Sequence, residues 1–457
     1  MGFQGLTGFG GGATSLSVAG GAASYPADSF WVRLFEKGDW QTEYTEQCAG
    51  DLEGNVYMSA IRYSAGGQGY KGVSIIKVDV EGALSWQKVQ YSNPTGTSIE
   101  NLTLCPIQDG TAVYTAGQSD FGLNITKWDS SDGSELWTKL MGNSSANNKI
   151  MYFAKVSDGN PISWGTNYSP GSGLMFLTKF DSSGSQTWIS GITGSTTSVQ
   201  PDNGMQPKID SSGNIHTTAY QQYSGTKYCG VLKHDSLGAL QSATDYLLGT
   251  DEDMFRDIAV DSAGNKYILF SFKAGSAPLY RGGIMKVNSS DVIQWQKEVY
   301  NGVDSTTITP MQVDVTSTGE MIARFFDWKT NMAIIFIRFQ ADGTIVYKRE
   351  FKLASGGLGA YNGTMQLNRN DNIIFNTSTT GTVNQILGQL PGDGSLTGTH
   401  GNYEWNDATS ITVGTYSGWT KQASSIFSST SSAMAMSALT TVQEENNVTT
   451  STLEVVD

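Results

Sequence analysis

The sequence predicts an all-β protein that folds as a β-propeller of four-stranded antiparallel blades. Three observations carry this prediction: two short motifs recur every 50–54 residues, glycine turns accompany both motifs, and no helical pattern is visible. A propeller blade is a four-stranded unit that recurs at about this spacing, whereas solenoids of the same period are usually helical. Seven copies of the repeat cover residues 49–400.

The first motif is a basic residue, then an apolar residue, then an aspartate. It reads Lys77-Val78-Asp79, Lys127-Trp128-Asp129, Lys179-Phe180-Asp181 and Lys233-His234-Asp235, decaying to Lys286-Val287-Asn288, Arg338-Phe339-Gln340 and Gln389-Leu390-Pro391. An early copy is Arg33-Leu34-Phe35. A glycine turn and an aromatic residue follow most copies, and the tryptophans among them are Trp86, Trp137, Trp188 and Trp295. We expect these tryptophans to be structural repeat positions, buried where neighbouring blades meet.

The second motif precedes the first and begins with Asp51, Asp210 or Asp261 in its clearest copies, as in Asp261-Ser-Ala-Gly-Asn-Lys-Tyr267. Glycine and asparagine tolerate positive φ, so this pattern is typical of a hairpin turn between two strands. Two hairpins per period give four strands. Both motifs together resemble the SBBP repeat, a family of seven-bladed β-propeller repeats. That resemblance implies a fold and says little about activity, because propellers host many functions.

The number of blades is open at this point. The sequence contains seven copies of the second motif but eight basic-apolar segments, of which the extra one lies in residues 31–44. We expect this segment to pair with residues 411–419, so that N- and C-terminal strands close a composite eighth blade. The alternative is seven closed blades with both ends of the chain free to dock elsewhere.

Composition divides the chain into a glycine-rich N-terminal arm (1–28), a propeller (29–422) and a Ser/Thr-rich acidic tail (423–457). The arm is uncharged and carries three large apolar residues, Phe3, Leu6 and Phe9. Glycine allows close backbone approach, and apolar side chains can fill pockets on another protein. We therefore expect these three residues to form an attachment arm.

Charge and cysteine content exclude several classes of protein. The net charge is −14, which argues against nucleic-acid binding, and no apolar run is long enough for membrane insertion. The three cysteines are too widely spaced for a CxxC metal site, and their odd number leaves a free thiol. The abundance of Gly, Ser, Thr and Asn is typical of an extracellular surface, yet the N-terminus shows no export signal.

No catalytic, cofactor or metal site is expected. His216 and His234 occupy strand positions of the repeats, and the sequence, which also contains His400, shows no Cys/His cluster, HExxH or GxSxG pattern. Asp251-Glu-Asp253 with Asp257 lacks the spacing of a calcium loop, so we interpret it as a solvated loop. Two further patterns are read as structural: residues 129–137 resemble the Asp-box of sialidases without their arginine cluster, and the glycines of 8–12 follow no strand.

These features favour a virion structural protein of a tailed phage, made in the cytoplasm without a signal. The first sixteen residues resemble the glycine-rich starts of tail or capsid-associated proteins of such phages. The expected protein is non-enzymatic, oligomeric within an assembly, and bound to other virion proteins through its terminal arms, with a host glycan or receptor as a further partner. The alternatives are a lectin-like bacterial surface or secreted propeller and a carbohydrate-active enzyme.

Overall fold

The computed structural model describes the chain from Trp31 to Val455, with gaps. The described ranges are 31–35, 42–63, 71–91, 99–106, 110–119, 122–141, 147–154, 160–169, 172–194, 199–200, 206–223, 226–247, 254–273, 280–302, 306–329, 332–359, 363–380, 385–400, 402–422, 427–430, 436–438, 442–443 and 454–455. These residues form strands, turns and loops. No helix among them is long and apolar enough to cross a membrane.

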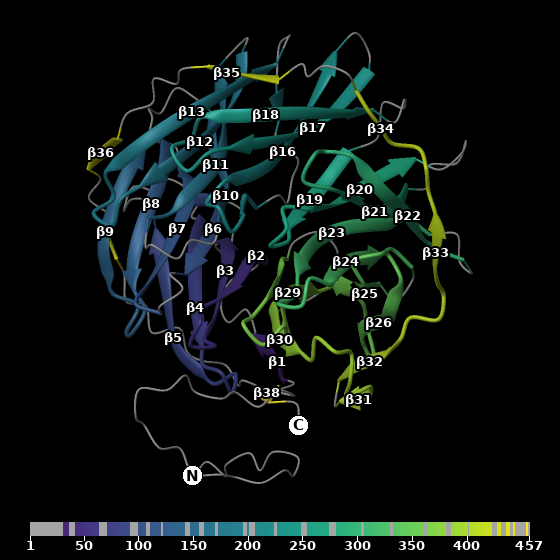
Figure 1. Cartoon of the computed structure of the whole chain (residues 1–457). Helices are drawn as coiled ribbons and strands as arrows, with labels where there is room; N and C mark the ends of the chain where they lie inside the picture. Colours follow the sequence, from purple (N-terminus) through teal and green to yellow (C-terminus); the bar gives the residue numbers. More distant parts are fainter. Residues whose placement is uncertain are drawn as a thin grey trace, which may run out of the picture.

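Seven antiparallel sheets form the blades of a β-propeller, as the sequence predicts (Figure 1). In each of the first three blades, four consecutive strands run from the innermost to the outermost position. Blade 1 contains β2 (Thr42–Gly50), β3 (Val56–Tyr63), β4 (Lys71–Val78) and β5 (Leu84–Tyr91). Blade 2 contains β6 (Ile99–Pro106), β7 (Ala112–Ser119), β8 (Gly122–Asp129) and β9 (Glu135–Met141). Blade 3 contains β10 (Asn147–Ala154), β11 (Ile162–Ser169), β12 (Ser172–Phe180) and β13 (Gln186–Gly194).

The next three blades repeat this order, with a split inner strand in blade 4. Blade 4 contains β14 (Val199–Gln200), β15 (Lys208–Ile209), β16 (Ile215–Tyr223), β17 (Thr226–His234) and β18 (Leu240–Leu247). Blade 5 contains β19 (Met254–Val260), β20 (Lys266–Lys273), β21 (Tyr280–Val287) and β22 (Ile293–Asn301). Blade 6 contains β23 (Ile308–Val315), β24 (Met321–Asp327), β25 (Ala333–Phe339) and β26 (Ile345–Leu353).

Blade 7 takes its outermost strand from the other end of the chain. Its inner strands are β27 (Leu358–Gly359), β28 (Met365–Leu367), β29 (Ile373–Thr379) and β30 (Gln385–Leu390), and β1 (Trp31–Phe35) pairs with β30. Trp31 lies opposite Gln389 in this pairing, as Trp86 lies opposite Lys77 in blade 1. The N-terminal strand therefore supplies the aromatic residue that the seventh repeat lacks.

The expected composite eighth blade is not formed by the described residues. The segment Arg33-Leu34-Phe35 is an outermost strand of blade 7, not an early copy of the first motif. Ile411–Thr415 forms β33, which pairs with β22 of blade 5 instead of with the N-terminal segment. The ring closes with seven blades because β1 completes the seventh sheet, which leaves no unpaired inner strands on which an eighth blade could build.

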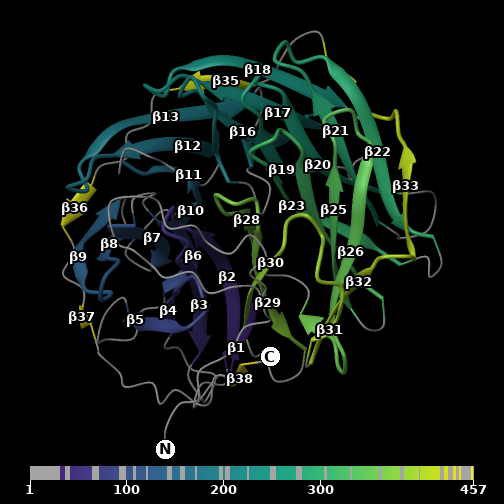
Figure 2. The same cartoon turned by 60° about the horizontal axis from the view of Figure 1, so that its bottom comes forward.

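After blade 7 the chain runs back around the outside of the ring and adds a short strand to every blade in reverse order (Figures 1 and 2). We name residues 403–455 the strap. A small hairpin on blade 6, formed by β31 (Gly398–His400) and β32, leads into the strap. The strap strands are β32 (Tyr403–Asp407), β33 (Ile411–Thr415), β34 (Thr420–Lys421), β35 (Phe427–Thr430), β36 (Met436–Ala438), β37 (Val442–Gln443) and β38 (Glu454–Val455). The described parts of the tail 423–457 are thus strands on the ring itself.

Both hairpin turns of a blade lie at the same end of its strands, because consecutive strands are antiparallel. We call the end formed by the first-to-second and third-to-fourth strand turns the turn face. The outermost strand β1 starts at this face, where Trp31 packs against Gly82 in the third-to-fourth strand turn of blade 1. β38 runs antiparallel to β1 and ends toward the same face. The described chain therefore begins and ends at the turn face beside blade 7.

Candidate functional site

The recurring basic residue and tryptophan join each blade to the next. Lys77 Nζ and Trp86 Nε1 of blade 1 both donate to the backbone oxygen of Ser130 in blade 2, at 2.8 and 2.9 Å. In blade 5, Lys286 and Trp295 donate in the same way to Ala341 O of blade 6. Two donors that converge on one carbonyl fix the angle between neighbouring blades, so these repeat positions are structural.

The tryptophans also pack against glycines of the next blade. Trp86 lies against Gly133, Trp137 against Gly184, Trp188 against Gly238, and Trp295 against Gly343. Trp86 is buried, at 8% exposed, whereas Trp137, Trp188 and Trp295 are only partly buried. These three therefore lie at the blade contacts, as expected, but are less buried than expected. Their rings cover the seam between blades and keep part of their surface exposed.

The aspartates of the second motif hold their own turns together. Asp261 accepts hydrogen bonds from the backbone N–H groups of Ala263 and Asn265, from the Asn265 side chain, and from the Tyr267 hydroxyl at 3.1 Å. Asp51 makes the corresponding contacts in blade 1. These hydrogen bonds use both carboxylate oxygens, which explains why the motif recurs.

The three histidines lie in strands, as expected for His216 and His234. His216 replaces the motif tyrosine, and its Nε2 lies 3.0 Å from Asp210 Oδ2. Its neighbour Asp210 is held ionised by hydrogen bonds from His216 and Asn214, which lower its pKa to about 2 despite partial burial. Burial lowers the pKa of His234 to about 4. His400 Nε2 lies 2.9 Å from the backbone oxygen of Leu396.

Several sequence predictions concern residues outside the described ranges. These are the attachment residues Phe3, Leu6 and Phe9 and the acidic loop 251–253. The interpretation as a solvated loop is wrong for Asp257, which is buried in strand β19. Cys48 and Cys229 are buried, and neither is part of a disulfide. Among the described residues, no group of three His, Cys, Asp or Glu side chains is arranged to hold a metal ion.

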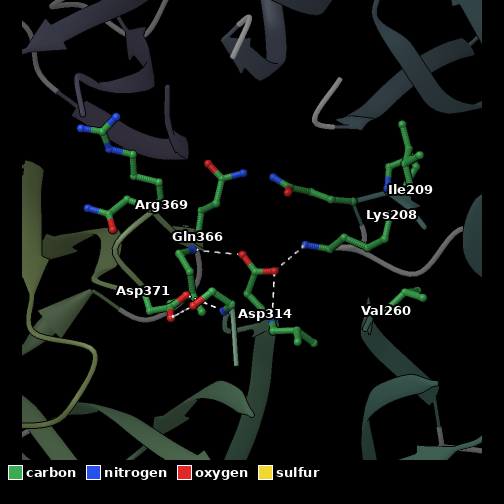
Figure 3. Close-up of a pocket in the computed structure, with 13 residues that line it drawn as sticks. Lys208, Ile209, Val260, Asp314, Gln366, Arg369 and Asp371 are labelled. Atoms are coloured by element: carbon green, nitrogen blue, oxygen red, sulfur yellow. Dashed lines mark hydrogen bonds and ion pairs between the residues drawn. The ribbon is translucent and has the colours of Figure 1, made fainter. Parts of the chain in front are cut away.

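One cavity stands out in the described part of the chain, at the turn-face end of the central channel (Figure 3). It has a volume of about 350 Å³ and is lined by the ends of four innermost strands and the turns that follow them, in blades 4 to 7. The polar side chains that line it include Lys208, Asp314, Gln366, Arg369 and Asp371. We take this channel pocket as the candidate site.

Polar side chains of the innermost strands bind the inner edge of the next blade. Asp257 of blade 5 accepts from the Val313 N–H of blade 6 at 2.9 Å, and Asp314 accepts from the Leu367 N–H of blade 7 at 3.0 Å. Gln366 of blade 7 accepts from the Gly50 N–H of blade 1 at 2.9 Å. The N–H groups on an inner edge have no further strand to pair with, and these side chains satisfy them.

Lys208 is the cationic centre of the channel pocket, and Figure 3 shows it pointing toward Asp314. Its Nζ lies 3.9 Å from Asp314 Oδ1, and the side chain is 18% exposed. Burial acts to lower the pKa of Lys208, but the carboxylates of Asp314 and Asp257 together raise it, so the ammonium stays charged. Asp257 is more deeply buried, and burial raises its pKa to about 7, against the pull of Lys208.

The polar lining of the pocket suits a polar ligand. Its carboxylates already accept hydrogen bonds from other residues of the ring. Asp371 accepts from the Ser317 N–H and hydroxyl, at 2.8 and 2.6 Å, and Asp314 is shared between Leu367 and Lys208. These carboxylates join blades 6 and 7 and hold Lys208 in place.

The sequence analysis did not predict this pocket, and of the polar positions that recur in the innermost strands only Gln206 lines it. The residue four positions before the second motif is polar in five blades, where a buried inner strand ordinarily carries apolar side chains. These residues are Gln47, Gln206, Asp257, Gln312 and Thr364. Each is buried in the structure. A polar position inside an otherwise apolar strand would have indicated side chains that bind the inner edge of the next blade, as Asp257, Gln312 and Thr364 do.

Comparisons with known proteins support the fold alone. No protein-family model matches the chain, and no curated protein matches it. The polysaccharide lyase Uly1 is 8% identical over 75% of this chain and 90% of its own, with a TM-score of 0.49. Drosophila Semaphorin 2a is 7% identical over 81% and 77%, with a TM-score of 0.49, and the Dos1 propeller is 10% identical over 79% and 95%, with 0.44. No match supports the resemblance to SBBP repeats or to virion proteins, and likenesses this distant carry no argument about activity.

Proposed function

We propose that the chain is a non-enzymatic structural component of a tailed-phage virion, a propeller ring that binds neighbouring virion proteins or a host receptor. The observation that carries this proposal is the meeting of both ends of the described chain, β1 and β38, at the turn face of blade 7. Residues 1–30 join the ring at Trp31, so an arm that contains Phe3, Leu6 and Phe9 would extend from one point on that face.

The strap supports a role in a crowded assembly. The outermost strand of a blade presents unpaired backbone groups, which invite pairing with strands of other molecules. Strap strands pair with the outermost strand of each of the seven blades. The strap strands contain only two to five residues each, and such short edge strands limit uncontrolled strand addition when subunits are packed at high local concentration, as in a particle.

The roles of the repeat residues support a structural function over a catalytic one. The recurring lysines, tryptophans and aspartates form the seams and turns, and the pocket carboxylates join blades. Membership of the SBBP-type repeats belongs to the same proposal. Its support is the period of 50–54 residues and the seam that each period builds.

The test is the protein content of purified particles from the phage that encodes this chain. We expect mass spectrometry to find the chain at a fixed copy number per particle. Deletion of residues 1–28 should leave a folded ring, because the described fold begins at Trp31, but should remove the chain from particles. Recovery of the chain only from a bacterial surface or culture medium would instead favour the lectin-like alternative.

A further inference from the structure

Arg324 is buried where blades 6, 7 and 1 meet. It lies on β24 of blade 6 and is 1% exposed. Its Nη2 donates to the backbone oxygen of Asn376 in blade 7 at 3.1 Å, and a Cβ added to Gly363 would lie 3.2 Å from the same nitrogen. The Cys48 thiol of blade 1 is close enough to influence the pKa of Arg324. The guanidinium therefore lies between blades, far from the outer surface of the ring.

This guanidinium keeps its charge and has no counter-ion in the part of the chain that the structure describes. Burial lowers the pKa of Arg324 to about 10, which leaves the group protonated at neutral pH. Its Nε and Nη1 atoms have no hydrogen-bond partner. Burial raises the pKa of the Cys48 thiol to about 12, so this neighbour is neutral and cannot balance the charge. An unpaired buried charge is strongly destabilising, and proteins ordinarily pair such groups.

A second buried donor without a partner belongs to the residue that Arg324 contacts. Asn376 is fully buried, and its Nδ2 has no acceptor. Its Oδ1 accepts from the Thr364 N–H, and Thr364 Oγ1 accepts in turn from the Cys48 N–H at 2.6 Å. The oxygens of this cluster are thus used by protein donors, while N–H groups of Arg324 and Asn376 are left over. The cluster lacks an acceptor, and the acceptor must carry a negative charge.

We propose that one small monovalent anion of the halide class, such as chloride, binds beside the Arg324 guanidinium. A halide accepts hydrogen bonds from several N–H groups and balances the single charge. A water molecule could accept from the same groups, but it would leave the charge unpaired. A divalent anion would bring a second charge into a buried place with no further cation to balance it. The guanidinium is itself weakly hydrated, which suits an ion that must give up its own water to enter.

The ion would support the junction at which the ring closes. The inner edge of blade 7 is joined to blade 1 by the Thr364–Cys48 contact and by Gln366, which accepts from the Gly50 N–H. Arg324 reaches the same edge from blade 6 through Asn376. An anion at this place would hold three blades together. This inference goes beyond the proposed function and does not depend on it, because it concerns the ring in any assembly.

The test measures the stability of the full chain at constant ionic strength while chloride replaces gluconate, a larger anion that a buried site would not admit. Urea denaturation should show the folding equilibrium constant rising about tenfold for each tenfold rise in chloride above the dissociation constant, as expected for one bound ion. Bromide should replace chloride. Crystals grown in bromide should show an anomalous diffraction peak in contact with Arg324.

Three variants locate the effect. Arg324→Leu should lose the chloride dependence and be at least as stable as wild type in gluconate, because the unpaired charge is gone. Asn376→Asp keeps the acceptor for the Thr364 N–H and supplies a carboxylate next to Arg324, so it should also lose the dependence. Arg33→Leu is the matched control. Arg33 is 4% exposed and donates to Gly82 O at 2.6 Å and Glu81 O at 3.0 Å, so this variant should be less stable and keep the full dependence.

Equal stability of the wild type in chloride and gluconate would overturn the proposal. A water molecule at the guanidinium in bromide-grown crystals, with no anomalous peak, would do the same, as would an undiminished chloride dependence in Arg324→Leu. If Arg324→Leu fails to fold, the bromide crystals and Asn376→Asp decide the question. Particle content is measured separately, so its outcome bears on the virion role alone.

Discussion

Trp86 and Gly133 are in contact across the seam between blades 1 and 2, and a Cβ added to the glycine would lie 2.8 Å from the indole Cε3 atom. Gly133 also has a φ of 72°, a conformation that side chains other than glycine rarely adopt. The same turn provides the Ser130 carbonyl that accepts from Trp86 Nε1. One glycine thus serves both the shape of the turn and the close approach of the next blade.

Substitution of Gly133 should show how much the positive φ and the contact with Trp86 each contribute to stability. Gly133→Ala should lower the free energy of unfolding by about 1–2 kcal/mol for the positive φ, plus roughly 1–3 kcal/mol for the clash with Trp86. Gly319→Ala is the matched control, because Gly319 has a φ of 82° and no atom within 4 Å of the added Cβ. Urea denaturation of both variants would measure the difference. Equal losses in the two would mean that Trp86 moves away at no cost.

The seam explains how much of the fold the sequence could predict. Lys77, Trp86 and Asp51 act within a repeat or on the next one, so their spacing recurs and predicts four-stranded blades. The partner of Gln389 is Trp31, which lies at the far end of the chain. No local pattern indicates such a pairing, and the N-terminal strand therefore suggested an extra blade.

The strap and the channel pocket escaped prediction for different reasons. Strap strands such as β34 and β37 contain two residues each, too few for an alternating pattern of apolar and polar residues. The pocket is formed by residues of different blades, such as Lys208 and Asp314, which meet only once the ring has closed. Their polar character was visible in sequence, but not the neighbour that each would contact.

His234 should make the fold sensitive to acid. Burial lowers its pKa in the folded protein to about 4, whereas the unfolded chain binds the proton near pH 6.5. Between these values the unfolded state holds more protons, so stability falls as pH drops from about 6.5 to 4, by roughly 2–3 kcal/mol. His234→Phe should remove this loss, because other repeats carry an apolar residue there, such as Phe180. Denaturation curves at pH 7 and pH 4.5 would measure it.

The reciprocal variant is the control for this prediction. Phe180→His places a histidine at the corresponding buried position of blade 3 and should create a similar loss in acid. Asp235 and His216 lie near His234 and also influence its charge, so their substitution should alter the size of the effect but not its sign. An unchanged acid dependence in His234→Phe would contradict the prediction.

Asp257 should give the stability a pH dependence of the opposite sign to that from His234. Burial raises its pKa to about 7, so the folded state holds a proton that the unfolded chain has lost above about pH 4. Stability from this group therefore falls as pH rises from about 4 to 7. Asp257→Asn retains an oxygen that can accept from the Val313 N–H, and it should stabilise the protein at pH 8 relative to pH 5 by roughly 2–4 kcal/mol. Melting temperatures at both pH values would test it, and an equal effect at both would show that Lys208 keeps Asp257 ionised.

The first half of the strap should contribute more to the free energy of unfolding of the ring than the second half. Trp405 is fully buried, donates to the Ser395 carbonyl at 3.0 Å and packs edge-on against Phe336. Trp405→Ala should therefore cost about 3–5 kcal/mol, the range for removing a large core side chain. Equilibrium denaturation would measure this loss.

Truncation after Gln422 should have a different consequence. It removes β35 to β38, which contain two to four residues each, and keeps the buried strap residues Trp405, Ile411 and Trp419. The truncated ring should unfold at nearly the same denaturant concentration as the full chain, yet aggregate faster, because the outer edges of blades 1, 2, 3 and 7 become free to pair with other molecules. Light scattering at constant temperature would follow the aggregation, with Trp405→Ala as the comparison for a loss of stability alone. A truncated ring that is as unstable as Trp405→Ala, or that stays as soluble as the full chain, would show that the second half of the strap does not serve to cover edges.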